Sequence, residues 1–132
     1  MVKIYLYICF TLFTLLLVSC SDTVNNIFST IEITSQQNST DATKLMKGVC
    51  QQFTLTDDQI LSYFSEASVT NEQTIHDQHD IFPCYSTGKI NISGDTYNWI
   101  IRAGGVGEYY NDKNKVLLVC KEKCCKKTKG IC

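Results

Sequence analysis

The pattern of apolar and polar positions predicts one amphipathic helix in the middle of the chain. Residues 56–59 read Thr-Asp-Asp-Gln, a capping box in which the threonine hydroxyl and the glutamine side chain satisfy backbone groups of the first turn. The two aspartates lie where the helix dipole favours negative charge. An apolar stripe at helical spacing follows, formed by Ile60, Leu61, Phe64 and Ala67. We therefore expect a helix over residues 57–67.

From residue 84 onward, apolar positions alternate with polar ones, which is the period of half-buried strands. Four stretches carry this alternation: 84–92, 96–103, 107–110 and 115–120. Turn signals separate them at Ser93-Gly94-Asp95, Gly104-Gly105 and Asn111-Asp112-Lys113-Asn114. These elements predict an α+β fold, namely a four-stranded antiparallel meander with the 57–67 helix packed on one face.

Residues 21–43 are dominated by small polar side chains and predict a tether. Fourteen of these 23 residues are Ser, Thr, Asn or Gln, and none is Gly, Pro, Lys or Arg. A short strand around Ile31 and Ile33 is conceivable, but its polar flanks offer nothing to bury. A short helix is expected over 41–47, between Asp41 as N-cap and Gly48 as C-terminal stop.

The first twenty residues predict an export signal. Lys3 is the lone cation, and an unbroken run of apolar residues and threonine extends from residue 4 to 18. The run matches the core of a signal peptide and is shorter than the ~20 residues that span a bilayer. A short membrane helix is the alternative interpretation.

The run ends in Leu17-Val18-Ser19-Cys20, which resembles the lipobox of bacterial lipoproteins. The resemblance implies cleavage before Cys20, lipid attachment to its sulfur and a stable membrane anchor without a spanning helix. Ser21 in the next position implies the outer membrane, with the domain facing the periplasm. These boundaries divide the chain into a signal peptide (1–19), a lipidated cysteine with its tether (20–43) and one domain (44–132). The alternative is a secreted protein cut after Cys20 or Ser21, for which the sequons at Asn38 and Asn91 would be suitable.

The cysteine count predicts three disulfides in the exported domain. Of eight cysteines, Cys9 leaves with the signal peptide and Cys20 is lipidated or removed. Six remain: Cys50, Cys84, Cys120, Cys124, Cys125 and Cys132. Fifteen pairings stay open. We favour Cys84 with Cys120, because the meander brings the start of its first strand and the end of its last strand to the same end of the sheet.

Few motifs in the chain carry chemistry. His76-Asp77-Gln78-His79-Asp80 is either a metal-binding helical segment, with His76 and His79 as ligands, or an exposed loop. Gly104-Gly105-Val106-Gly107 lacks the Gly-Lys-Ser/Thr ending of a phosphate loop and is interpreted as a hairpin connection. The cysteine-rich tail is interpreted as disulfides and not as a thiolate metal site. We therefore expect a protein that is not an enzyme and that needs no cofactor.

Charge is divided unevenly along the chain. Residues 20–112 carry four basic and twelve acidic side chains, whereas residues 113–132 carry seven lysines and one glutamate. The formal net charge of −1 argues against nucleic-acid binding. We expect the cationic tail to contact an acidic partner or anionic lipid, with aromatic residues beside it. The predicted contact residues are Lys121, Lys123, Lys126, Lys127, Lys129, Tyr109 and Tyr110. The alternative is that these lysines only keep this end soluble and protect the last strand from pairing.

Two fragments resemble periplasmic lysozyme-inhibitor lipoproteins, namely Ser93-Gly94-Asp95-Thr96-Tyr97 and Thr128-Lys129-Gly130. Their separation is longer than in that family, a helix over 57–67 does not belong in its all-strand barrel, and the cysteine layout differs. Nothing is carried over from it. The expected function is that of a membrane-anchored, non-catalytic protein-binding module of the cell envelope, of inhibitor or immunity type. An envelope assembly or structural accessory lipoprotein is the alternative.

Overall fold

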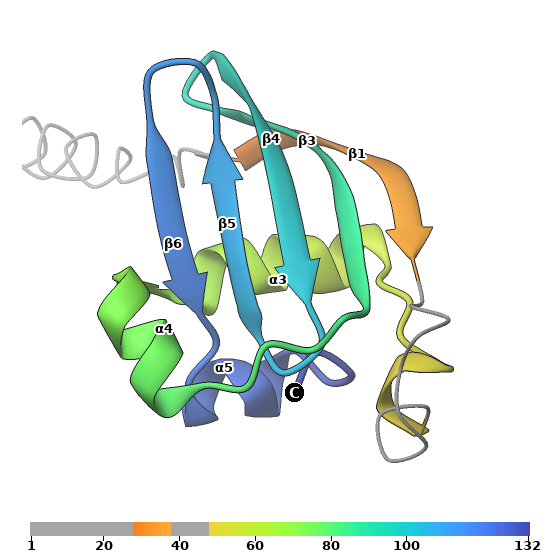
Figure 1. Cartoon of the computed structure of the whole chain (residues 1–132). Helices are drawn as coiled ribbons and strands as arrows, with labels where there is room; N and C mark the ends of the chain where they lie inside the picture. Colours follow the sequence, from red (N-terminus) through yellow and green to blue (C-terminus); the bar gives the residue numbers. More distant parts are fainter. Residues whose placement is uncertain (1–27, 38–47) are drawn as a thin grey trace, which may run out of the picture.

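The computed structural model describes residues 28–37 and 48–132, which form an antiparallel six-stranded sheet with short helices (Figure 1). The strand order across the sheet is β1-β3-β4-β5-β6-β2. The strands are β1 (Phe28–Gln37), β2 (Ser68–Thr70), β3 (Tyr85–Ile92), β4 (Asp95–Arg102), β5 (Val106–Tyr110) and β6 (Lys115–Val119). The helices are α3 (Asp57–Glu66), α4 (Glu72–Gln78) and α5 (Glu122–Lys127). The α+β class is confirmed, and the sheet has two strands more than the meander we predicted.

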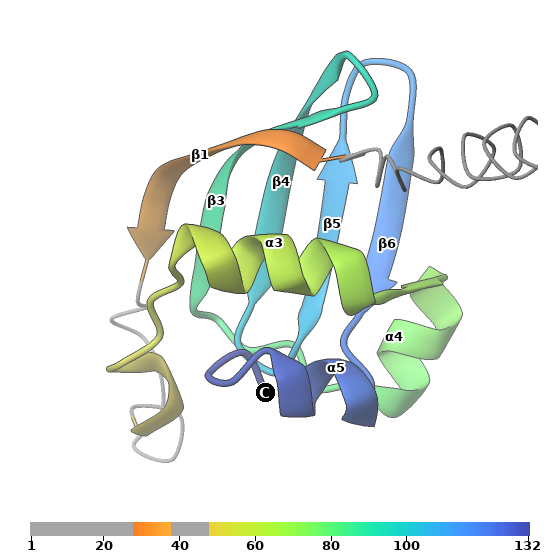
Figure 2. The same ribbon diagram turned by 180° about the vertical axis from the view of Figure 1, so that it is seen from behind.

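Helix α3 crosses one face of the sheet and encloses the core (Figure 2). The predicted capping box is present: the Thr56 side chain accepts from the Gln59 backbone N–H, and the Gln59 side chain reaches back to the Thr56 N–H. Phe64 packs edge-on against Trp99 at 6.1 Å between ring centroids. Ile60, Trp99 and Ile101 are each at most 1% exposed. Burial of this apolar face, more than helix propensity, holds α3 in place.

The four predicted strands of the meander are confirmed as β3, β4, β5 and β6, with ends that differ from the prediction by at most one residue. Ile92 pairs with Asp95, so the hairpin turn between β3 and β4 consists of Ser93 and Gly94. Both turn residues have positive φ, at 53° and 94°. Such a two-residue turn matches the right-handed twist of the flanking strands.

The prediction of a tether is wrong for residues 28–37, which form β1 and pair antiparallel with β3. Ile31 and Ile33 of this largely polar strand pack against the core. The Gln36 side chain also joins β1 to the segment before α3: its Oε1 accepts from the Leu55 N–H at 2.8 Å, and its Nε2 donates to the Leu55 carbonyl at 3.1 Å. The sequence therefore marks this strand only by its alternation.

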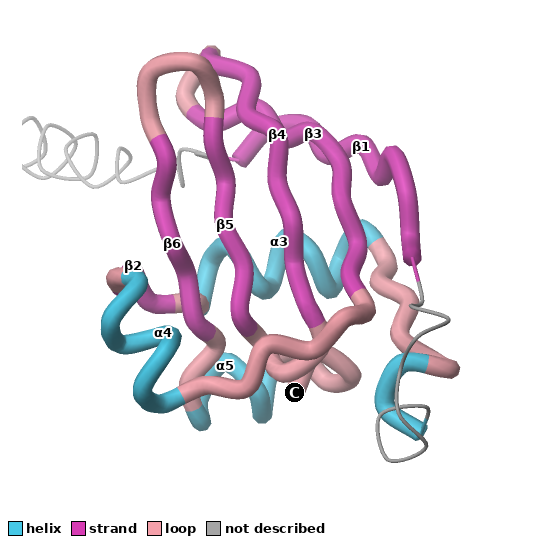
Figure 3. Tube along the Cα trace, viewed as in Figure 1, coloured by secondary structure: helices cyan, strands magenta, loops and turns pink. Residues whose placement is uncertain are grey.

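Three short elements were not predicted: β2, α4 and α5. The loop interpretation of the histidine segment is wrong for residues 76–78, which belong to α4 (Figure 3). The Asn71 side chain caps this helix by accepting from the Thr74 N–H at 2.9 Å. Elements of three to seven residues are too short to show a period, and contacts distant in sequence hold them: β2 pairs with β6, and α5 packs against α3.

Several predictions lie outside the described residues: the signal peptide, the lipid site Cys20, the two ends of the tether (20–27 and 38–43), the sequon at Asn38 and the helix over 41–47. The prediction that this helix ends at Gly48 is wrong, because residues 48–50 are helical. Among the residues that the structure describes, no helix is long and apolar enough to cross a membrane.

Candidate functional site

The predicted disulfides gather at one end of the sheet, where β3 begins and β6 ends. The pairs are Cys50–Cys84, Cys120–Cys124 and Cys125–Cys132. The favoured pair Cys84–Cys120 is therefore wrong, although both residues do lie at this end. Cys84 is bonded to the segment before α3 instead, and Cys120 to the first turn of α5. Sequence alternation locates strand ends but gives no information on which segment packs beside them.

Two of these disulfides touch one another. The Sγ atoms of Cys120, Cys125 and Cys132 lie within 4.8 Å of one another, although they belong to different disulfides. Each sulfur is already bonded to a partner cysteine, so the group is a disulfide cluster without thiolates to offer to a metal. Gly105, with φ of +81°, makes room for it: a Cβ there would stand 2.8 Å from Cys120 Cβ and 3.1 Å from Cys132 Sγ.

The Gly104-Gly105 segment is the connection between β4 and β5, as predicted. Its Gly104 N–H donates to the carbonyl of Ile131 at 2.8 Å, which fastens the C-terminal segment to the end of the sheet. On the other side of the connection, the buried Tyr63 hydroxyl donates to the Gly105 carbonyl at 3.1 Å. Desolvation of this hydroxyl raises the pKa of Tyr63 well above its usual range. The Tyr63 hydroxyl therefore keeps its proton and acts as a structural hydrogen-bond donor.

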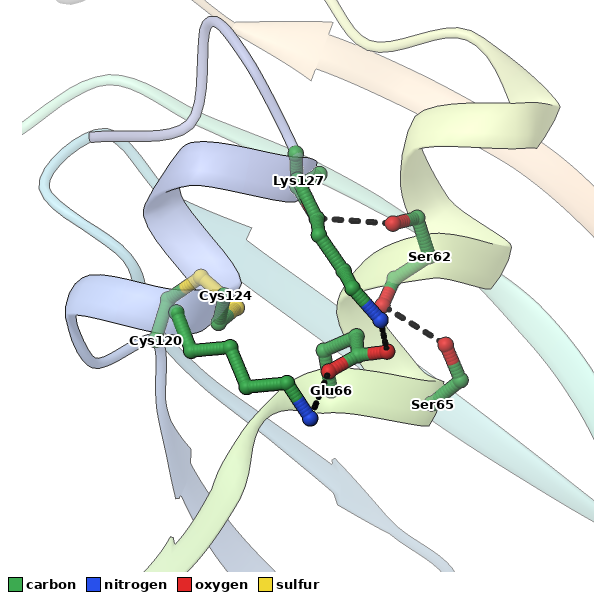
Figure 4. A network of polar contacts seen from close by, with 8 residues as sticks. Ser62, Ser65, Glu66, Cys120, Cys124 and Lys127 are labelled. Atoms are coloured by element: carbon green, nitrogen blue, oxygen red, sulfur yellow. Dashed lines mark hydrogen bonds and ion pairs between the residues drawn. A yellow bond between two sulfur atoms is a disulfide. The ribbon is translucent and has the colours of Figure 1, made fainter.

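The predicted lysine surface is exposed, but much of its charge is used within the protein. Lys127 and Lys123 both form ion pairs with Glu66 at the end of α3, the latter at 3.5 Å (Figure 4). The Lys127 hydrogen bond, assisted by the charge of Lys123, lowers the pKa of Glu66. Lys126 pairs with Glu122 on the same helix. The Lys123 and Lys127 contacts with Glu66 join α5 to α3, so ion pairs as well as disulfides connect the segments at this end.

The two tyrosines predicted beside the lysines lie elsewhere. Tyr109 and Tyr110 end β5 next to the 111–114 turn, whereas α5 follows the opposite end of β6 (Figure 1). Tyr109 packs edge-on against Phe64 and Tyr97 and is half-buried. Tyr110 is 42% exposed. The structure therefore does not bring the predicted aromatic and cationic contacts together. The tyrosines lie at the start of β6 and the lysines follow its end, so the length of the strand separates them.

A groove occupies the outer face of the sheet, opposite α3. Alternation along β4 sends Trp99 and Ile101 toward α3, so Ile100 and Arg102 face outward. Ile100 pairs with Glu108 and Glu108 with Leu117, which aligns these three side chains across β4, β5 and β6. Opposed residues in an antiparallel sheet share a face. The row forms the floor of the groove.

Residues of helix α4 and of the segment after it line this groove together with the strands. Figures 1 and 3 show α4 beside the end of β6 and the segment that runs from α4 to β3. The groove encloses about 390 Å³, a size typical of ligand sites. Its apolar lining residues are Ile75, Ile81, Ile100, Val106 and Leu117. Its polar lining residues include Glu72, His76, Arg102, Glu108 and Lys115. Ile81, at its lip, is 58% exposed.

Charges around the groove are unequally satisfied. Lys115 Nζ lies 2.9 Å from Glu108 Oε2, and this hydrogen bond and charge raise the pKa of Lys115. Arg102 is the only arginine of the sequence. Its guanidinium carbon lies 5.3 Å from the centre of the Tyr85 ring, and no carboxylate within the described ranges pairs with it. Arg102 is thus the cation of the groove that is available to an incoming anion.

The candidate metal ligands His76 and His79 both come from the α4 segment. His76 is exposed, and its Nδ1 lies 3.0 Å from Asp77 Oδ1. His79 follows the last residue of the helix and is half-buried. Across residues 28–37 and 48–132, the structure does not gather a third ligand around these two histidines. His76 instead contributes to the rim of the groove.

The groove residues were missed from the sequence. Ile100, Glu108 and Leu117 are ordinary outward positions of three separate strands, and their alignment follows from register alone. One signal for the groove was available in the sequence: Arg102, on a predicted strand, is the single arginine of a chain whose other basic residues, apart from two histidines, are all lysines. No family model, curated protein or solved structure matches this chain, so its function is argued from this geometry.

Proposed function

We propose that this protein is an exported, membrane-anchored, non-catalytic binding module that holds a segment of a partner protein in the groove beside α4. The observation that carries this proposal is the groove itself, an open site whose floor places Glu108 between the apolar residues Ile100 and Leu117, with a charged rim around it. Exposed apolar positions grouped with convergent polar ones are typical of binding surfaces.

The scaffold supports binding because it is stiffened around the groove. The Cys50–Cys84 disulfide anchors the start of β3, and the Cys120–Cys124 disulfide anchors the end of β6. Phe82 packs over Gly104, where a Cβ would stand 2.7 Å from the phenylalanine ring, so the segment after α4 is pressed against the end of β4. A rigid site loses little conformational entropy when a partner binds.

The groove replaces the lysine surface as the primary contact. Glu66 neutralises much of the charge of Lys123 and Lys127, and Tyr109 is packed into the core side of the sheet. Lys121 and Lys129 remain exposed without an ion pair among the described residues. In the proposal, these two positive charges attract an acidic partner or anionic lipid headgroups and so raise the rate of association.

Membrane attachment through Cys20 remains part of the proposal and rests on the lipobox-like sequence. Metabolic labelling with a clickable fatty acid tests it. The wild-type chain should take up label and Cys20→Ala should not. Equal labelling of both chains, or none of either, would contradict the anchor.

The binding proposal is tested by placing a photo-crosslinking amino acid at Ile81, on the lip of the groove, in the cells that naturally make the protein. Leu61 is the matched control, an exposed apolar residue on α3 at the other face of the sheet, with 38% exposure. We expect a discrete crosslinked product from position 81 that position 61 does not give. The same products from both positions, or none from position 81, would overturn the assignment of the groove.

A further inference from the structure

The groove ends in a corner. Helix α4 walls it on the β6 side, and the segment leading from α4 to β3 crosses the end of β4 (Figure 1). Close contacts fix that segment there, because the Phe82 ring and the Asp80 carbonyl both lie beside Gly104. A site closed on two sides accommodates the end of a chain more readily than a segment that must continue in both directions.

Arg102 occupies this corner. It is half-buried as the last residue of β4, and it pairs across the sheet with Tyr85, whose ring it contacts. A contact with an aromatic ring still leaves guanidinium N–H donors for a carboxylate, which arginine binds through two parallel hydrogen bonds. The neighbouring outward residue on β4 is Ile100, about one two-residue step away, or ~7 Å along the strand.

The other charges of the groove do not compete for the same anion. Lys115 is engaged by Glu108 at 2.9 Å, and the charge of Glu72 acts on the same ammonium group. Glu72 and Glu108 together carry one more formal charge than Lys115 neutralises, so the β5–β6 side of the groove keeps a net negative charge and repels an incoming carboxylate. Arg102 remains as the group with which an incoming carboxylate would pair.

From this arrangement we infer that the occupant of the groove is the C-terminal residue of a partner protein, an aliphatic residue whose free carboxylate pairs with Arg102 while its side chain lies on Ile100 and Leu117. The inference rests on the proposed binding function and names the chemistry of the same site. It makes Arg102 a specificity-determining residue: a carboxylate beside an aliphatic group is accepted, and the same group without the carboxylate is not.

The test uses two small probes that differ only in this group, N-acetyl-leucine and N-acetyl-leucinamide. Each is titrated into the isotope-labelled protein, with all disulfides intact, and followed by amide chemical shifts. We expect the acid to bind with a dissociation constant in the millimolar range, as for a fragment of this size. Its shifts should centre on Ile100, Arg102 and Leu117, and the amide should bind at least tenfold more weakly. N-acetyl-aspartyl-leucinamide, which carries its carboxylate on a side chain, should also bind more weakly than the acid.

Variants separate the role of Arg102 from a general effect of positive charge. Arg102→Gln should weaken the acid at least tenfold and leave the amide unchanged. Lys89→Gln removes an exposed cation from the same outer face of the sheet, on β3, and should leave both probes unchanged. Comparison of wild-type binding to the two probes needs no variant, so a misfolded Arg102→Gln protein does not remove the test.

Equal binding of acid and amide, or no groove shifts with either, would overturn this inference while leaving the crosslinking test of the groove intact. Tighter binding of the aspartyl probe would assign the carboxylate to an internal acidic side chain and would also overturn it. Conversely, selective binding of the acid in the absence of a position-81 crosslink would show a carboxylate site that does not serve a protein partner.

Discussion

The disulfide pairing makes a quantitative prediction about where the stability of this protein resides. Cys50 and Cys84 are 34 residues apart in sequence, whereas Cys120 and Cys124 are 4 apart. In the chain-entropy account, a disulfide stabilises the fold by restricting the unfolded chain, and the effect grows with the logarithm of the loop it closes. The long loop corresponds to about 3.8 kcal/mol and the short one to about 1.9 kcal/mol.

Two double variants isolate this difference. One carries Cys50→Ala with Cys84→Ala, and the other carries Cys120→Ala with Cys124→Ala, so neither leaves an unpaired thiol that could exchange. All four half-cystines are at most 5% exposed, so the loss of buried sulfur is similar in both variants. The free energy of unfolding in urea should therefore fall by about 1.9 kcal/mol more in the first variant.

The reasoning is refuted if the two variants lose equal stability or if the order is reversed. A tryptic map without reduction first checks the partner of Cys84. Trypsin cuts after Lys121 and Lys123 but not between Cys124 and Cys125, so the Cys120 peptide should stay joined through a disulfide to the peptide that holds these two cysteines. Cys50 and Cys84 lie on one tryptic peptide, which should not be joined to the Cys120 peptide. A peptide linking Cys84 to Cys120 would contradict the connectivity on which the magnitude depends.

The remaining predictions concern an ion pair, a close contact and a buried hydroxyl. Because lysines lower the pKa of Glu66, its contribution to stability is present above the ordinary pKa of glutamate and is lost as pH falls through the lowered value. Glu66→Gln should therefore destabilise the protein in urea at pH 7, and this loss should shrink as the pH is lowered below the ordinary pKa of glutamate; a loss that is the same at every pH would exclude the ion pairs as the cause. Gly88→Ala should destabilise the protein by about 1–3 kcal/mol, because the new Cβ would stand 1.8 Å from the Glu32 carbonyl oxygen of β1. The control is Gly48→Ala, whose new Cβ meets nothing within 4 Å, so the urea midpoint should stay nearly unchanged. Similar midpoints for both variants would mean that β1 does not pack on β3 as described. Tyr63→Phe should cost about 0.5–1.5 kcal/mol by thermal unfolding, since the Gly105 carbonyl keeps its second donor, the Cys120 N–H, and a much larger loss would show that the hydroxyl does more than close this contact.

Several elements could be predicted because their information is local. The capping box at 56–59 begins α3, and the period of two from residue 84 locates four strands to within one residue at each end. The Ser93-Gly94 turn follows from residues that tolerate positive φ. In each case the pattern is local, and each of these strands pairs with the next strand along the chain.

The unpredicted elements depend on distant partners. Strand β1 is polar apart from Phe28, Ile31 and Ile33, and it is held by pairing with β3 and by the Gln36 contacts to Leu55. Helix α5 is held by ion pairs to Glu66 and by the disulfides at its first turns. Neither segment carries enough local information to be assigned from its own residues.

The sequence by itself determined the α+β class, the main helix, the meander, the presence of six cysteines able to pair and the separation of charge, because each is a property of composition or of short-range period. Only the tertiary structure decided which cysteines pair, that the lysines of α5 share Glu66, and that Tyr110 lies far from them. It also decided that Ile100, Arg102 and Leu117 line one groove. Strand register and the packing of a helix on a sheet face bring together residues that are distant in sequence. A pattern of apolar and polar positions along the chain does not indicate which of these residues become neighbours in space.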